Sequence, residues 1–182
     1  DYFLEENDSE KLIFEYLDNL LEKTADKLLP EDQVSNWKFD NLDKALSQML
    51  GSSPDFNLIE RNNLNFGKVM DYLNNYYQKF YVEKFNKLKE RKAELERQIA
   101  IQVMDAAWKR HLQNIDALRS NIGLRAYAQR NPINEFKKES FYLFDSMIEA
   151  FKDDIVKILF NIKIQTMSKE EFEQRKNQNK NN

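Results

Sequence analysis

The chain has 182 residues, of which 41% are hydrophobic and 13% aromatic, so it is long enough to bury one modest hydrophobic core. Its formal net charge is −3, and its three glycines and three prolines are too few for a sheet-rich protein, which needs such residues at its turns. With no cysteine and one histidine, the sequence excludes a disulfide framework and any metal site made of thiolates or several imidazoles. The composition therefore predicts an all-α protein.

Charge is divided unevenly along the chain, because residues 1–60 contain fifteen acids and five bases whereas the remainder contains sixteen acids and twenty-three bases. A basic half of a protein can contact nucleic acid or anionic lipid. Here the bases alternate with acids along helical faces, which favours a solvated helix surface. We therefore expect no nucleic acid partner and keep a basic nucleic-acid-binding protein as the minor alternative. No window approaches the ~20 apolar residues that a membrane-spanning helix needs.

Two helices are predicted in the first part of the chain. Apolar side chains recur at helical spacing over residues 10–28, and Pro30 follows as a stop signal. A second apolar stripe runs over residues 42–50 and is closed by Gly51, which suits the C-terminal cap of a helix. Residues 51–65 are expected to be mostly loop with one helical turn.

A third helix, rich in aromatic residues, is predicted from Phe66 to about Arg91. Its apolar positions, among them Tyr77, Phe80 and Phe85, recur at helical spacing and suit packing among short helices. A membrane-surface helix is a weaker alternative, because acids and asparagines dilute any cationic face.

From about Ala93 the sequence carries two apolar stripes whose spacing alternates between three and four residues, the pattern of a coiled-coil seam. The predicted hairpin core consists of Met104, Trp108, His111, Ile115, Leu118 and Ile122, then Phe144, Ile148, Phe151 and Ile155. A short connection, residues 123–131, separates the stripes, and Asn131 with Pro132 supplies an N-cap and a tolerated first helical residue. We predict a long antiparallel two-helix hairpin with arms of about 40 Å.

Residues that could carry chemistry are scarce. The sequence contains no phosphate-binding loop, zinc-protease helix or nucleophile elbow, so we expect no catalytic residue, metal site or cofactor within this chain. His111 is the one candidate general base, but its place on the apolar stripe favours a packed, hydrogen-bonded histidine. Trp108 is likewise expected in the core rather than in a ligand site.

The connection of the predicted hairpin is a candidate binding site. Leu124, Arg125, Tyr127 and Arg130 place apolar, aromatic and cationic groups where an inert connection would use small polar residues. Tyrosine and arginine dominate binding energy at interfaces, and a rigid hairpin presents them with little ordering cost. At this point both binding of a partner and docking onto the same chain are open.

Three strings in the hairpin region carry a family resemblance. Met104 to Leu112 reads MDAAWKRHL, Asp116 to Gln129 reads DALRSNIGLRAYAQ, and Asn131 to Phe144 reads NPINEFKKESFYLF. These strings resemble the end of SecA, the ATPase of preprotein export. The resemblance is dense over residues 98–164, and over residues 10–97 it lies in pattern and order more than in identity.

The resemblance implies a division of the chain into four parts. In order, these are the end of the long scaffold helix (1–29), the helical wing domain (30–95), the two-helix finger with the scaffold return (96–164) and a flexible C-terminal linker (165–182). The sequence leaves open whether the wing and the hairpin share one hydrophobic core.

By the same resemblance, Tyr127 is the fingertip residue that touches the translocating preprotein, with Leu124, Arg125 and Arg130 beside it. The parent would be a protein-exporting ATPase that binds ATP and Mg²⁺ in nucleotide-binding domains outside this chain. Its implied partners are those domains, the preprotein and the SecY channel (SecYEG), and a homodimer is left open. The implied location is cytoplasmic, as a peripheral protein on the bacterial inner membrane.

Two functions therefore compete for the chain. The first is the substrate-contacting and coupling region of a protein translocase, in which the scaffold relays and regulates the ATP cycle. The second is a generic helical protein–protein interaction module without motor function. A phosphate-binding loop in the preceding part of the full-length protein would favour the first.

Overall fold

The computed structural model describes residues 9–29, 37–88, 91–125 and 131–164, and for residues 123–125 it describes the backbone alone. Every regular element in these ranges is a helix, which confirms the predicted all-α class. The elements are α1 (Ser9–Leu28), α2 (Phe39–Leu50), the 3₁₀-helix η3 (Phe56–Leu58), α3 (Phe66–Phe85), the 3₁₀-helix η4 (Asn86–Leu88), α4 (Arg91–Arg125) and α5 (Pro132–Asn161).

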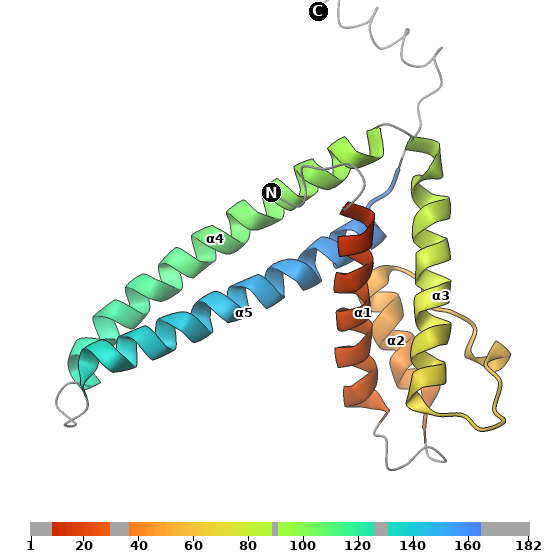
Figure 1. Cartoon of the computed structure of the whole chain (residues 1–182), viewed down its shortest axis with the longest axis horizontal. Coiled ribbons are helices and arrows are strands. Elements are labelled where there is room, and N and C mark those ends of the chain that lie inside the picture. Colours follow the sequence, from red (N-terminus) through yellow and green to blue (C-terminus); the bar gives the residue numbers. More distant parts are fainter. Residues whose placement is uncertain (1–8, 30–36, 89–90, 126–130, 165–182) are drawn as a thin grey trace, which may run out of the picture.

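The helices form two regions that meet at the C-terminal end of α5 (Figure 1). α4 and α5 lie side by side and antiparallel, as the short connection between them predicts. α1, α2 and α3 stand together and pack around the C-terminal part of α5. The hairpin therefore projects from a helical cluster that holds it at one end.

The first two helices end where the sequence predicts. α1 ends two residues before Pro30. α2 ends at Leu50, and Gly51 follows with φ 73° while its N–H donates to the Ser47 carbonyl, which confirms the predicted cap. Within residues 51–65, all of which are described, η3 supplies the expected helical turn.

α3 is shorter than predicted. It begins at Phe66, where the Asn65 side chain accepts a hydrogen bond from the Lys68 N–H, but it ends at Phe85 rather than near Arg91. Phe85 is the last buried residue of the apolar stripe, and Leu88 beyond it packs against the core only partly buried. The chain then passes through η4 before α4 begins. Residues 86–91 contain no glycine or proline, so the sequence carries no stop signal there.

The two long helices exceed the predicted length. α4 continues to Arg125, so Gly123 lies inside the helix although glycine costs about 1 kcal/mol there relative to alanine. α5 begins at Pro132, and the Asn131 side chain accepts from the Ile133 N–H, which confirms the predicted N-cap. With 35 and 30 residues, the helices extend about 50 and 45 Å.

One hydrophobic core joins the helical cluster to the base of the hairpin. Its buried side chains come from α1, α2, α3, the first half of α4 and the second half of α5. Phe160 of α5 is 2% exposed, and its ring centroid lies 5.6–5.9 Å from those of Tyr77, Phe80 and Tyr81 of α3. Burying a side chain of this kind contributes roughly 2–3 kcal/mol. The two regions therefore share one core.

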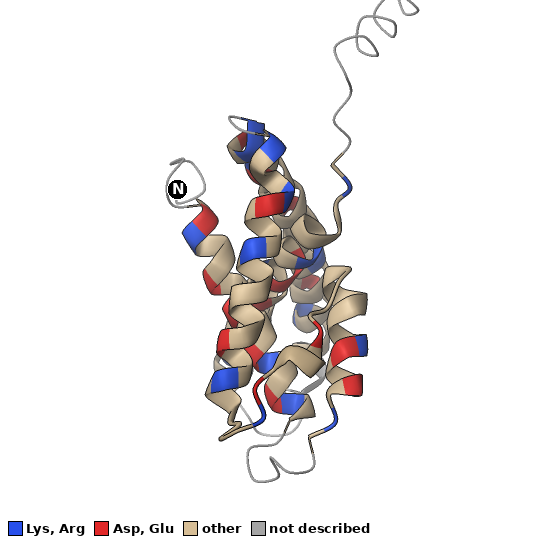
Figure 2. Cartoon of the chain, turned by 90° about the vertical axis from the view of Figure 1, so that its right-hand side faces the viewer, with Lys and Arg blue, Asp and Glu red and all other residues tan. Residues whose placement is uncertain are grey.

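The surface mixes charges of both signs. Lysine and arginine alternate with aspartate and glutamate along the helices in the view of Figure 2. Among the described residues, no helix combines the length and the hydropathy that crossing a bilayer requires. Most of the large apolar side chains that do reach the surface lie on α4 and α5.

Candidate functional site

The seam between α4 and α5 is built on small side chains. Ala100 and Ala107 are 6% and 2% exposed and alternate with buried Val103. These positions are three or four residues apart, so they lie on one helical face and allow the two helices to approach closely. Farther along α4, His111 and Leu118 continue the line with 8% and 7% exposure.

The ten residues of the predicted hairpin core are distributed across this seam and its edges. The buried ones are His111, Leu118, Phe151 and Ile155. The half-buried ones are Met104, Ile115, Ile122 and Ile148. Trp108 and Phe144 are 45% and 44% exposed and lie at the edge, because Ala107 rather than Trp108 occupies the closest line of contact. Sequence reasoning missed Ala100 and Ala107, and small residues at three- and four-residue spacing are the signal that reveals such a seam.

His111 lies between two aromatic rings. Its imidazole centroid is 5.4 Å from the ring of Trp108 and 5.8 Å from that of Phe144. The side chain is packed, but its buried Nδ1 has no hydrogen-bond partner among the described residues, which differs from the expected hydrogen-bonded histidine. The rings of Trp108 and Phe144 pack against the imidazole, so its surroundings in this part of the seam are largely aromatic.

The outer half of the hairpin exposes large apolar side chains. Over residues 132–146 of α5, all of which are described, no side chain is buried. Besides Trp108 and Phe144, the exposed apolar residues here are Leu112 (47%), Ile133 (66%), Phe141 (66%) and Tyr142 (57%). Exposed apolar surface that gathers in one place typically marks a contact site. The outer hairpin is therefore suited to binding.

The predicted contact residues lie at the limit of the described structure. Tyr127 and Arg130 fall within residues 126–130, which are outside the described residues. Leu124 and Arg125 belong to the last turn of α4, for which the backbone alone is described. The roles of these four residues stay predictions.

Charged side chains tie α5 to α4 and α1. Arg110 of α4 lies 3.3 Å from Asp154 of α5. Lys23 of α1 pairs with Glu149 of α5, which also lies 2.7 Å from Lys152. Hydrogen bonds from Lys152 and then from Lys23 lower the pKa of Glu149 to about 2. The apolar periodicity of the sequence could not reveal these ion pairs between helices, because the paired residues are far apart in the chain.

The sequence that forms the helical cluster and the hairpin matches a known family. A sequence model of the SecA Wing and Scaffold domain covers residues 1–163, which is almost the whole chain. The chain belongs to the SecA family. This membership confirms the resemblance that the strings of the hairpin region carry.

Individual SecA proteins agree with the family match. The chain is 38% identical over 162 residues to the protein translocase subunit SecA of Pelagibacter ubique, an alignment that covers 86% of the chain and 19% of that protein. Identity to the SecA of Helicobacter hepaticus is 34% over 145 residues, covering 79% and 17%. Identity to the SecA of Aquifex aeolicus is 33% over 163 residues, covering 88% and 16%. The chain therefore spans less than a fifth of the length of these relatives.

Proposed function

We propose that this chain is the substrate-contacting and coupling region of a protein translocase. In this proposal the hairpin touches the polypeptide in transit, and the helical cluster relays and regulates an ATP cycle carried out elsewhere in the protein. The observation that carries the proposal is the α4–α5 hairpin, which is anchored in a core at one end and exposes aromatic side chains along its outer half. The SecA relatives named above are protein translocase subunits.

A hairpin anchored in this way can carry a displacement over a long distance. Phe151, Ile155 and Phe160 fix the base of α5, since each is at most 7% exposed. From Phe160 to the start of α5 the helix extends about 40 Å. Because α4 packs along α5, the pair resists bending better than a single helix. A movement of the cluster would therefore reach the far end of the hairpin.

The far end of the hairpin would make the contact. A polypeptide of arbitrary sequence cannot be recognised through its side chains, so the contacting residues must tolerate many partners. Tyr127 combines an aromatic ring with a hydroxyl that can bond to backbone amides. Arg125 and Arg130 can donate to backbone carbonyls or to acidic loops of a channel, and Leu124 adds apolar surface.

The remaining parts of the machine would lie outside this chain. ATP and Mg²⁺ would bind in nucleotide-binding domains of the full-length protein, and the SecY channel would receive the preprotein that the hairpin contacts. The protein would act at the cytoplasmic face of the bacterial inner membrane as a peripheral protein. The helical cluster would connect the nucleotide-binding domains to the hairpin.

Disulfide cross-linking tests the contact, because the chain contains no cysteine that would interfere. Tyr127→Cys is introduced into the full-length protein, any cysteine outside this chain is replaced, and a preprotein with one cysteine is stalled in the channel. We expect a cross-link at position 127 that requires both ATP and the channel.

Two further positions serve as controls in the same experiment. Lys79→Cys reports random collision, since Lys79 is exposed on α3 in the helical cluster. Arg119→Cys, exposed on the outer part of α4, shows how far any contact extends along the arm. Equal cross-linking at 79 and 127, or none at either position, would favour an interaction module without motor function.

A further inference from the structure

Glu96 is a carboxylate buried at the point where α4 leaves the helical cluster. The residue is 2% exposed. Its Oε1 accepts a hydrogen bond from the Tyr81 hydroxyl of α3 at 2.5 Å, and its Oε2 accepts one from the Ser9 hydroxyl of α1 at 2.7 Å. A single side chain of α4 is thereby bonded to two other helices.

Lys92 is the fourth member of a group that also contains Glu96, Tyr81 and Ser9. It lies one turn before Glu96, 3.7 Å from Glu96 Oε1, and also pairs with Glu10 of α1. Its ammonium group is 4.9 Å from the centroid of the Tyr81 ring. Burial, and then the charge of Glu96, raise the pKa of Tyr81, so its hydroxyl keeps its proton and stays a donor. Both oxygens of the buried carboxylate therefore have partners.

The stability of the fold does not by itself explain this group. Taking a carboxylate out of water costs about as much as its hydrogen bonds and its ion pair return, and well-packed apolar side chains often serve equally well. A hydrogen bond differs from an apolar contact in one respect, because it weakens steeply when its donor and acceptor move out of line. The group is therefore suited to fixing an angle between helices.

The attachment of the hairpin shows why an angle needs to be fixed. α5 ends inside the shared core, and α4, whose first half also contributes apolar side chains to that core, packs chiefly against α5. Apolar contacts of this kind allow α4 to tilt, and a second, directional attachment of α4 to the helical cluster fixes the direction of the hairpin. We infer that Glu96, with Ser9 and Tyr81, is this second attachment and sets the direction in which the hairpin points.

Because α4 is long, a small change of its tilt at Glu96 causes a large displacement of its far end. About 45 Å of helix lie between Glu96 and Arg125, so a tilt of about 10° displaces the end of the helix by about 8 Å. The consequence for function rests on the proposed function, because the position of the far end matters only if that end contacts the polypeptide. Glu96 acts through the hairpin and is a positioning residue.

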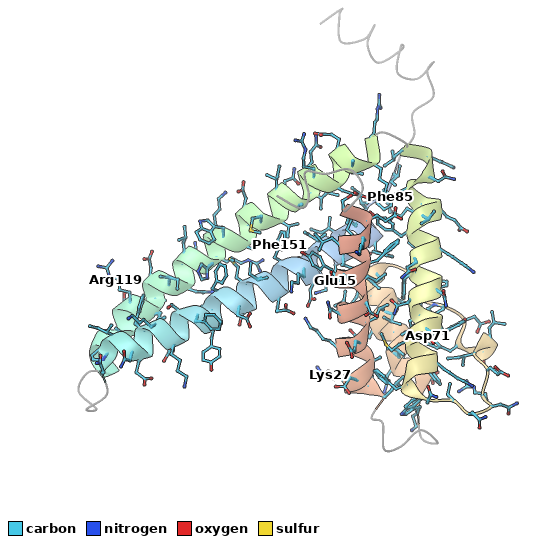
Figure 3. All side chains as sticks on the ribbon, in the orientation of Figure 1. Glu15, Lys27, Asp71, Phe85, Arg119 and Phe151 are labelled. Carbon is cyan, nitrogen blue, oxygen red and sulfur yellow. The ribbon has the colours of Figure 1, made fainter. Side chains whose placement is uncertain are left out.

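Distances between spin labels test the inference in the full-length protein. The labels are attached at Asp71→Cys on α3 and Arg119→Cys on α4, both exposed and both labelled in Figure 3. The test variant combines Ser9→Ala, Tyr81→Phe and Glu96→Leu, which replaces the carboxylate and its two hydroxyl donors by apolar side chains and so avoids a buried unpaired donor, while Lys92 keeps Glu10 as its partner. We expect the helix content to be retained, while the distribution of distances becomes about twice as wide or moves by several Å.

Two single variants accompany the triple variant. Glu96→Gln keeps the shape and the acceptor for Tyr81 but loses the charge, and should widen the distribution less. If the triple variant loses helix content, Glu96→Gln alone tests the inference. Glu94→Leu, on an exposed carboxylate two residues away, should leave the distribution unchanged. The inference would be overturned if Glu96→Gln and the triple variant both gave distance distributions as narrow as that of the parent protein and centred on the same distance.

Preprotein translocation measured on the same variants separates the two proposals. A widened distribution with slower translocation and unchanged basal ATP hydrolysis is the result expected if both hold. A widened distribution with unchanged translocation would support the role of Glu96 in direction but count against the hairpin as the contact with the polypeptide. An unchanged distribution rejects the role of Glu96 whatever the translocation rate.

Discussion

At the scale of single residues, Gly51 ends α2 beside the C-terminal end of α5. The Asn161 side chain donates to the Met49 carbonyl at 2.7 Å, and Lys84 donates to the Phe160 carbonyl at 2.5 Å, so α5 ends against α2 and α3. A Cβ on residue 51 would lie 2.8 Å from Asn161 Oδ1, and the φ of 73° is one that side chains rarely adopt. Glycine is therefore needed here both for the cap of α2 and for the docking of α5.

We predict that Gly51→Ala lowers the free energy of unfolding by about 1–3 kcal/mol, because alanine is strained in the left-handed region and displaces Asn161. Urea denaturation followed by circular dichroism measures the change. Gly67→Ala is the control, since Gly67 lies in the first turn of α3 and its added Cβ meets Asn65 Oδ1 at 3.4 Å. We expect no loss for the control. Equal losses of unfolding free energy in the two variants would mean that the α2–α5 junction does not specifically require glycine at position 51.

Glu149 is expected to make stability depend on pH. Its folded-state pKa of about 2 lies below the ordinary value of 4.5, so its contribution is complete above about pH 4.5 and declines as the pH falls toward 2. Because its side chain is 40% exposed, water screens the ion pairs, and Glu149→Gln should cost less than about 1 kcal/mol near neutral pH. Urea denaturation at several pH values measures the difference between the two proteins. A difference that stays constant below about pH 4.5 would contradict this account.

At the scale of elements, the hairpin depends on the small residues of α4. Ala107 is 2% exposed against α5, whereas the adjacent Ala106 is exposed. Ala107→Leu should force the helices apart and lower the free energy of unfolding by about 1–3 kcal/mol. Ala106→Leu adds the same groups on the exposed side and should change it by at most about 0.5 kcal/mol. Thermal denaturation compares the two, and equal melting temperatures would show that the seam lies elsewhere.

The ends of the helices show which boundaries local sequence can specify. Gly51 ends α2 and Asn131 begins α5 as predicted, because a cap depends on one residue and its own backbone. The end of α3 at Phe85 and the continuation of α4 through Gly123 were not predicted. α3 ends at the last buried residue of its apolar stripe, and α4 packs along α5, so both boundaries depend on neighbours that are distant in the sequence.

At the scale of the whole molecule, α5 is both an arm of the hairpin and the helix around which the cluster packs. We predict that Phe160→Ala lowers the free energy of unfolding by about 3–5 kcal/mol, because the ring fills the space between α5 and α3. Phe141→Ala, on the same helix but 66% exposed, should change it little. Urea denaturation measures both.

Hydrogen exchange shows whether the core is shared in solution. Phe160→Ala should speed exchange in α1 and α3 as well as in α5, because one cluster of buried side chains joins them. Faster exchange confined to α5 would mean that the hairpin and the cluster unfold independently. The predicted division into scaffold end, wing, finger and linker stays a prediction, since the shared core crosses its boundaries and residues 165–182 lie outside the described residues.

The sequence by itself determined the all-α class, the antiparallel hairpin and the SecA family. These follow from local signals: few glycines and prolines, apolar periodicity, caps, and strings of adjacent residues. Only the tertiary structure decided that the cluster and hairpin share a core, that Trp108 lies at the edge of the seam, and that Glu96 bonds to two other helices. Ser9 and Glu96 are 87 residues apart, and a contact over that separation leaves no periodic trace in either helix.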